Sequence, residues 1–275
     1  MKTSFRFKHL VIAVVALCTA LTAQTARAWD GSGTEASPYL IKNTADLDLL
    51  AHRVNGTHGE TANEYVGTYF RLEADIAYDH TGLGDTDSNY EAIGGNGDHS
   101  QYFQGIFDGQ NHVVSGIRIY KGGNRYQGLF GLIGYTAEVK NVILADAVIT
   151  GYNRTGSIVG YIGGGTVSDC HALATVTVHT VHNNVWQHGG IAGDNDGTVT
   201  RCTSAAAGIS SVCVGGIVGD NEGTVTHCIY LGTTLEGTTR VGAIAGQNDK
   251  GTVQTCYYTN TAIQGKDDAT TFILF

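Results

Sequence analysis

The sequence predicts an all-β protein that folds as a parallel β-solenoid, and three observations lead to this fold class. The 275 residues include 39 Gly and one Pro with 42% hydrophobic residues, and Val, Ile and Thr recur throughout, which suits short strands joined by tight turns. Five segments repeat one motif at a spacing of about 27 residues. None of these repeats shows the apolar spacing of three and four residues that a helical repeat requires.

The repeated motif is clearest in Gly215-Gly-Ile-Val-Gly-Asp-Asn-Glu-Gly-Thr-Val225. The five segments begin 28, 33, 26 and 27 residues apart, at Gly128, Gly156, Gly189, Gly215 and Gly242. A unit of this length with two or three short β runs is typical of one solenoid coil, whereas a propeller blade needs roughly 40–45 residues. The mature chain is therefore expected to form about seven stacked coils.

The residue three positions after the last Val of each repeat defines a predicted core column. Because Val199 and Cys202 would face opposite sides of one unbroken strand, we expect a corner between them. Alternation after Cys170 predicts that Ala172, Ala174, Val176 and Val178 point inward, and that Thr175, Thr177 and His179 face solvent. The core column consists of Val142, Cys170, Cys202, Cys228 and Cys256.

Residues 1–28 are predicted to be a secretory signal peptide. Three basic residues precede an apolar run over 10–21, and Ala26-Arg27-Ala28 forms a small-x-small cleavage signal. The run is too short to span a membrane, and no later stretch reaches about 18 apolar residues, so no membrane span is expected in the mature chain. Lipid attachment at Cys18 is disfavoured by the bulky Leu17. We expect the chain to be secreted or displayed at the cell surface.

Residues 29–127 are predicted to hold an N-terminal cap and the first coils, and residues 128–275 the repeat coils of the same β-helix. Apolar residues of 43–54 have helical spacing behind a cap at Asn43 or Thr44. This short helix is expected to cover the open end of the solenoid. The apolar residues 271–275 are expected to cover the last coil, unless the chain is a piece of a larger protein.

The charge balance excludes nucleic-acid binding. Without the four basic residues of the signal peptide, 12 basic and 25 acidic side chains remain, a net charge of −13. Nucleic-acid binding relies on clustered Lys and Arg to displace counterions, and the basic residues here are isolated.

The repeats resemble the GLUG motif, with residues 215–228 as the nearest copy, and the resemblance extends from 128 to about 258. The blocks at 38–41 and 107–112 resemble the leader of the same secreted bacterial proteins. The resemblance implies a right-handed parallel β-helix in adhesin-like surface proteins and in the non-catalytic region of some bacterial immunoglobulin-A peptidases. It does not imply an enzyme, since their zinc motif His-Glu-x-x-His is absent, and His58-Gly-Glu60 lacks its spacing and second His.

The five mature cysteines are expected to remain free. An oxidising compartment would permit disulfides, but column neighbours about 4.8 Å apart have parallel Cβ vectors that hold the Cβ atoms too far apart for an unstrained bridge. One strained disulfide and a thiolate metal site are the alternatives. Cys213 lies off the column and is the candidate reactive or unpaired thiol.

Acidic residues recur in the turns beside Asn195, Asn221 and Asn248. We interpret them as turn formers, so that no cofactor is required. Calcium is the alternative, since rows of oxygen ligands suit this ion, although the spacing does not match the nonapeptide calcium repeat. The calcium candidates are Asp194, Asp196, Asp220 and Glu222, and Asp249 occupies an equivalent place.

The longest spacing between repeats predicts a protruding loop that holds Trp186, His182 and His188. These are the candidate ligand-binding residues, because aromatic and polar groups on a loop suit a glycan or a host or surface protein. An ordinary insertion and a weak zinc site with His179 are the alternatives.

The sequence therefore predicts a non-enzymatic adhesion, binding or spacer module with no catalytic residue. The rival is a polysaccharide lyase or glycoside hydrolase on the same fold, which would need paired carboxylates in a groove. The scattered candidates for such a pair are Asp75, Asp79, Asp108 and Asp146.

Overall fold

The computed structural model describes residues 29–95, 100–182, 184–209, 212–259 and 262–264. The chain separates into two units, Met1–Asp30 and Gly31–Phe275, and every helix and strand named below belongs to the second. The predicted signal peptide and the apolar segment 271–275 lie outside the described residues. Within the described ranges, no helix is both long and apolar enough to cross a membrane.

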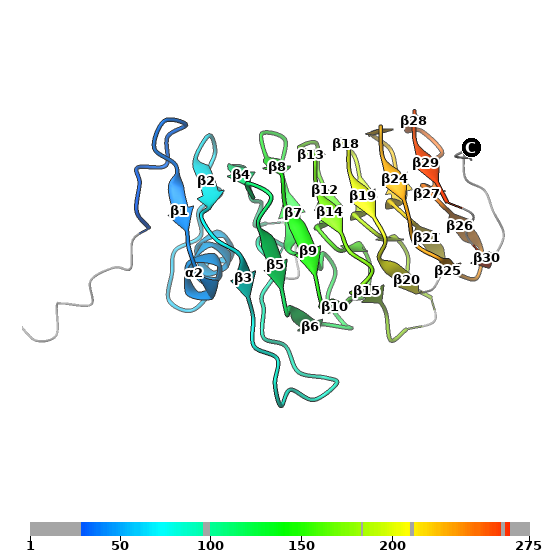
Figure 1. The fold of residues 1–275 in the computed structure, drawn as a ribbon, viewed down its shortest axis with the longest axis horizontal. Helices are drawn as coiled ribbons and strands as arrows, with labels where there is room; N and C mark the ends of the chain where they lie inside the picture. Colours follow the sequence, from blue (N-terminus) through cyan, green and yellow to red (C-terminus); the bar gives the residue numbers. More distant parts are fainter. Residues whose placement is uncertain (1–28, 96–99, 183, 210–211, 260–261, 265–275) are drawn as a thin grey trace, which may run out of the picture. The chain divides into compact units, whose positions relative to one another are not determined.

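The second unit is a parallel β-solenoid of about seven coils, as predicted (Figure 1). Its strands pair in parallel with the strands one coil before and after, so Val167 lies opposite both Val139 and Val199. The strands form five ladders, each built from strands of successive coils.

The first ladder has eight strands: β1 (Tyr39–Ile41), β2 (Tyr69–Leu72), β4 (Ile106–Asp108), β8 (Glu138–Lys140), β13 (Thr166–Ser168), β18 (Thr198–Thr200), β23 (Thr224–Thr226) and β28 (Thr252–Gln254). The second has seven: β3 (Ile76–Ala77), β5 (Val113–Ser115), β9 (Ile143–Ala145), β14 (His171–Ala172), β19 (Thr203–Ser204), β24 (Ile229–Tyr230) and β29 (Tyr257–Tyr258). The third has six: β6 (Arg118–Tyr120), β10 (Ala147–Thr150), β15 (Val176–His179), β20 (Ala207–Ile209), β25 (Thr234–Glu236) and β30 (Ala262–Gln264).

The remaining two ladders carry the glycine-rich part of the motif. The fourth consists of β11 (Thr155–Gly156), β16 (His188–Gly189), β21 (Cys213–Gly215) and β26 (Arg240–Gly242). The fifth consists of β7 (Phe130–Ile133), β12 (Val159–Ile162), β17 (Ala192–Asn195), β22 (Val218–Asn221) and β27 (Ala245–Gln247). A Cβ atom on Gly193 would lie 2.4 Å from the backbone nitrogen of Thr155, so close approach of the backbones requires glycine there.

The predicted corner between Val199 and Cys202 is confirmed. Arg201 between them has a left-handed φ of 52°, and the corresponding residue of every repeat coil has a φ between 51° and 54°. This turn lets both Val199 and Cys202 point into the core. All five residues of the predicted core column are fully buried. The corner residues are Asn141, Asp169, Arg201, His227 and Thr255.

The alternation predicted after Cys170 is wrong at one residue. Ala172, Val176 and Val178 are buried, but Ala174 is exposed. The amide of Val176 donates to the carbonyl of Leu173 at 3.0 Å, so a turn interrupts the period-two pattern. Thr175 beside Ala174 is exposed as predicted, and Thr177 and His179 are half-buried.

The predicted helix is present as α2 (Thr44–Asn55), capped by the Asn43 side chain, which accepts from the amide of Asp46. Leu47 and Leu50 on its inner face are fully buried. The helix lies at the β1 end of the solenoid (Figure 1), and the Tyr78 hydroxyl donates to the Asp48 carboxylate at 2.7 Å.

Candidate functional site

Trp186 lies on the surface, as predicted, and is held by groups from neighbouring coils. Its indole is 39% exposed, and the Arg240 guanidinium lies over the ring at 5.1 Å from its centroid. The backbone amide of Trp186 donates to Asn153 Oδ1 at 2.8 Å. A cavity of about 230 Å³ borders the ring and is also lined by Arg125, Asn153, Arg154 and Gln187.

The two histidines predicted to share this loop lie in different surroundings. His182 is exposed and meets the Tyr152 ring edge-on at 5.4 Å. His188 is fully buried, so its prediction as a ligand-binding residue is wrong. It begins β16, where it pairs with Thr155 and Val214 of the adjacent coils. Among the described residues, His179, His182 and His188 form no group that could hold a metal.

Burial makes His188 chemically unusual. Both of its ring nitrogens lack a hydrogen-bond partner among the described groups. Burial, with a smaller effect of the charge on His179, lowers the pKa of His188 to about 3. The imidazole is therefore neutral at physiological pH and belongs to the core.

The predicted acidic row forms beside the Trp186 cavity. Asp194 and Asp220 are register partners in β17 and β22. Asp194 is only 4% exposed, and its carboxylate accepts from Arg154 Nε at 2.8 Å. The Arg154 guanidinium also lies over the rings of Tyr161 and Tyr126, at 4.7 and 5.6 Å.

The electrostatics of this row follow from burial and from like charges. Burial raises the pKa of Asp194 to about 7, against the opposite effect of Arg154 and with a further rise from Asp220. Burial also raises the pKa of Asp220. A cluster of shifted carboxylates beside a cavity is a feature of functional sites.

The acidic row does not have the geometry of a calcium site. Within the described part of the chain, the four candidates belong to no group of ligands close enough for a metal. Each accepts from a different side chain: Asp194 from Arg154, Asp196 from the Tyr161 hydroxyl, Asp220 from Gln187 and Glu222 from Lys250. The neighbouring Asn195 Oδ1 accepts from the amide of Gly197 at 3.2 Å, which supports the interpretation of these segments as turns.

Arg154 and Gln187 connect the Trp186 loop with the acidic row, two features that were predicted separately from the sequence. Arg154 lines the Trp186 cavity and binds Asp194, while Gln187 lines it and donates to Asp220 at 3.3 Å. Sequence reasoning missed the basic and amide residues, which come from different coils and carry no motif. We call the combined surface the Trp186 face, made of Asn153, Arg154, Trp186, Gln187, Asp194, Asp220 and Arg240.

The five described cysteines are free and buried, as predicted. Cys213 was predicted to be reactive or unpaired, and it is unpaired. It does not have the surroundings of a reactive thiol, because it donates to the carbonyl of Gly219 at 3.0 Å and burial raises its pKa to about 12. A reactive cysteine needs exposure and a lowered pKa.

The scattered carboxylates of the rival enzyme prediction are held by their own neighbours. Hydrogen bonds from Val113 and His112 lower the pKa of Asp75, and bonds from Thr81 lower that of Asp79. A general acid in glycoside hydrolysis needs a raised pKa. Asp108 binds Gln110 and Asn141, and Asp146 binds Arg118 and His80.

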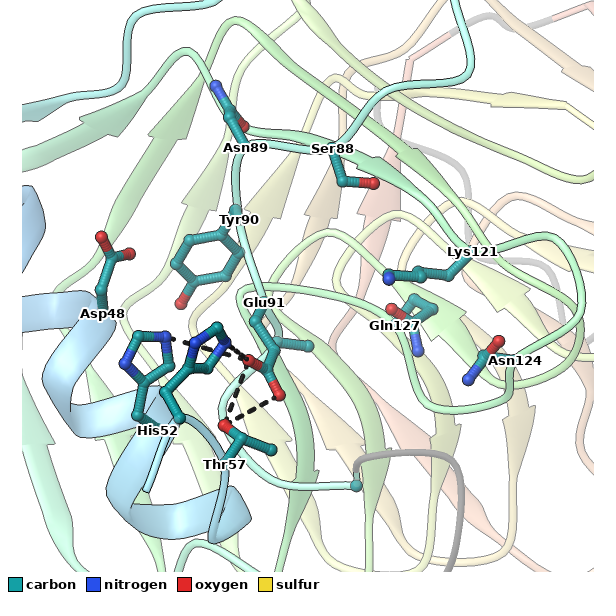
Figure 2. Close-up of a pocket in the computed structure, with 13 residues that line it drawn as sticks. Asp48, His52, Thr57, Ser88, Asn89, Tyr90, Glu91, Lys121, Asn124 and Gln127 are labelled. Atoms are coloured by element: carbon teal, nitrogen blue, oxygen red, sulfur yellow. Dashed lines mark hydrogen bonds and ion pairs between the residues drawn. The ribbon is translucent and has the colours of Figure 1, made fainter. Parts of the chain in front are cut away.

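One group among the described residues does have metal-ligand geometry. It consists of His52, His58 and Glu91 (Figure 2), which sequence reasoning missed. The sequence analysis considered His58 only as part of His58-Gly-Glu60, in the comparison with the zinc motif. The Glu60 carboxylate instead pairs with Arg53 at 3.0 Å. The spacing of the two histidines is a weak signal, and Glu91 is too distant in sequence to join them.

Comparison with known proteins gives partial matches. No family model matches the chain, so the resemblance to the GLUG motif stays a prediction. The chain is 32% identical over 161 residues to Halomucin of Haloquadratum walsbyi, covering 58% of this chain and 2% of Halomucin. It is 35% identical over 124 residues to a "Putative Gly-rich membrane protein" of Evansella cellulosilytica, covering 44% of this chain and 12% of that protein. The chain thus spans a small fraction of the curated relatives it matches.

The fold has a relative among solved structures. The crystal structure of a "putative immunoglobulin A1 protease" from Bacteroides ovatus superimposes with a TM-score of 0.55, covering 88% of this chain and 80% of that one. The likeness is one of fold alone, because the sequences are 21% identical.

Proposed function

We propose that this chain is a non-enzymatic module of a secreted or cell-surface protein, and that it acts in adhesion by binding a glycan or a surface protein at the Trp186 face. Two similarities support this proposal. The chain matches short parts of very long proteins, one of them named as a membrane protein. Its fold is a β-solenoid like that of the Bacteroides ovatus protein.

The observation that carries the proposal is the position of the Trp186 ring at the edge of a polar cavity. A half-exposed indole offers an apolar surface to the C–H face of a sugar ring or to an apolar side chain. The surrounding guanidinium, amide and carboxylate groups offer hydrogen bonds in several directions. Because Asn153 binds the Trp186 backbone and Arg240 covers its ring, little ordering of Trp186 is required on binding.

A binding screen tests this proposal. The secreted protein is applied to a glycan array and to host-matrix proteins, with and without calcium, beside Trp186→Ala and a control, Tyr135→Ala, whose ring is 83% exposed elsewhere. We expect saturable binding that Trp186→Ala weakens by about tenfold or more and Tyr135→Ala leaves unchanged. Binding to nothing by the folded protein would instead support a spacer role.

The rival function, a carbohydrate-active enzyme, has one supporting observation. The pKa of about 7 at Asp194 would suit a general acid. However, the carboxylate is buried and bound to Arg154, which favours a role in positioning Arg154 within the Trp186 face. Release of reducing ends or unsaturated sugars from polysaccharides, lost in Asp194→Asn, would support the rival instead.

A further inference from the structure

We propose that His52, His58 and Glu91 bind a zinc ion at the N-terminal end of the solenoid, in a site separate from the Trp186 face. The ligand atoms of the three side chains all lie within 4.8 Å of one another. Glu91 Oε2 lies 3.6 Å from His58 Nε2 and 4.0 Å from His52 Nε2. Zinc bonds of about 2.0–2.2 Å to such ligands require these ligand atoms to move closer together and the two imidazoles to rotate out of their stacked arrangement.

The end of α2 brings the two histidines together. Gly56 has a left-handed φ of 65° and closes the helix by donating to the carbonyl of His52. The chain then reverses, and His58, itself at a φ of 53°, stacks its ring on His52 with the centroids 3.9 Å apart.

The third ligand is oriented by its own hydrogen bonds. Asn55 Nδ2 donates to Glu91 Oε1 at 2.9 Å, and the Thr57 hydroxyl lies 3.3 Å from Oε2. Figure 2 shows the Glu91 carboxylate beside His52 and Thr57. Such supporting bonds hold a ligating carboxylate in place and are typical of metal sites.

The chemistry of the three donors selects the metal. Two imidazoles with one carboxylate suit zinc and its neighbours among the transition metals, whereas calcium prefers an all-oxygen shell.

A cavity beside the cluster leaves room for further ligands. It has a volume of about 510 Å³, and its lining includes the three ligands together with the polar residues Asn89, Lys121 and Gln127. Three protein ligands beside an accessible cavity leave a fourth zinc position to water or to a polar ligand. The ion would also tie the end of α2 to the segment that carries Glu91.

Calorimetry on the untagged, chelator-treated full protein tests the site. Zinc chloride at pH 7.5 is expected to bind with a stoichiometry of one ion per chain. We expect Glu91→Gln and His58→Ala each to weaken zinc binding by about tenfold or more. His58 is 64% exposed, so its replacement leaves the core intact.

Cobalt spectroscopy and a control variant complete the test. Cobalt in place of zinc should give visible absorption bands that His58→Ala changes and that calcium does not compete away. The matched control His182→Ala removes an exposed histidine of the other loop and should bind zinc like the parent. Three outcomes would each overturn the proposal: absence of saturable zinc binding by the folded protein, binding by His58→Ala and Glu91→Gln as tight as that of the parent, or loss of binding in His182→Ala.

Discussion

At the scale of single residues, two buried titratable groups change the stability of the fold in opposite directions as the pH rises. His188 has a pKa of about 3 in the folded protein, below its ordinary value of about 6.5. Its contribution to stability is therefore full above about pH 6.5 and is lost as the pH falls toward 3. Asp194 has a pKa of about 7, above its ordinary value. Its contribution is full below about pH 4 and is lost as the pH rises through 7.

We predict that single variants separate these two contributions. Between about pH 4.5 and 6.5, the free energy of unfolding of Asp194→Asn should rise more steeply with pH than that of the parent, and that of His188→Leu should rise less or fall. Over this window of two pH units each effect is at most about 2.7 kcal/mol, at about 1.4 kcal/mol per pH unit for one proton. Urea denaturation at several pH values measures both slopes. Slopes equal to the parent's in both variants would contradict the prediction.

The thiols lead to a second prediction at this scale. Burial raises the pKa of Cys202 and Cys213, and all five described cysteines are buried. A thiol reagent at pH 8 should therefore modify the native protein slowly and the urea-unfolded protein fast. In the native protein, Cys213 should be labelled no faster than the four cysteines of the core column. Mass spectrometry of labelled peptides checks this order. Rapid native labelling of Cys213 would restore the prediction that it is reactive.

At the scale of secondary-structure elements, one left-handed residue shapes each coil. It separates the first ladder from the second and lets the core column point inward. Asn and Asp adopt this conformation readily, but the last repeat coil places the β-branched Thr255 there at a φ of 51°, which is strained.

We predict that Thr255→Asn stabilises the fold by about 0.5–1 kcal/mol, because it places a residue tolerant of left-handed backbone at the corner. Asn141 occupies the same corner in the first repeat coil. The control Thr252→Asn, in the regular strand β28, should be neutral or destabilising, since Asn is disfavoured in strands. Urea denaturation measures both, and a lower stability of Thr255→Asn would contradict the corner as the source of strain.

At the scale of the whole molecule, buried asparagines connect successive coils. Asn195 and Asn221 are fully buried. Asn195 Nδ2 donates to Asn221 Oδ1 at 2.7 Å, and Asn221 Nδ2 donates to Asn248 Oδ1 at 2.6 Å. In a solenoid each coil contacts chiefly its neighbours, so these amide hydrogen bonds stabilise the contacts between successive coils.

We predict that the asparagines act as a unit. Asn221→Ala should destabilise the protein by about 1–3 kcal/mol, because it leaves buried amide groups unpaired. Combined with Asn195→Ala, the loss should fall short of the sum of the single losses by about 1 kcal/mol. Denaturation of the double variant tests this coupling. The exposed Asn124→Ala is the control, and additive losses in the Asn195 and Asn221 pair would contradict a shared network.

The sequence by itself determined the parts of the fold that depend on short-range pattern. The repeat spacing predicted the coils, the three-residue offset of Val199 and Cys202 predicted the corner, and the spacing of Leu47 and Leu50 predicted the helix. Each pattern is local and most recur from coil to coil, so a single chain contains several copies of the same information. The burial of Ala174 was predicted wrongly because one turn between strands breaks the alternation.

Only the tertiary structure decided which side chains meet. It buried His188, joined Trp186 to Asp194 through Arg154, and placed Glu91 beside two histidines of a helix end. Arg154 is 32 residues from Trp186 and 40 from Asp194, and Glu91 is 33 residues from His58 and 39 from His52. Their meeting depends on the register in which coils stack and on loop lengths between strands, because a shift of one residue turns a side chain from surface to core.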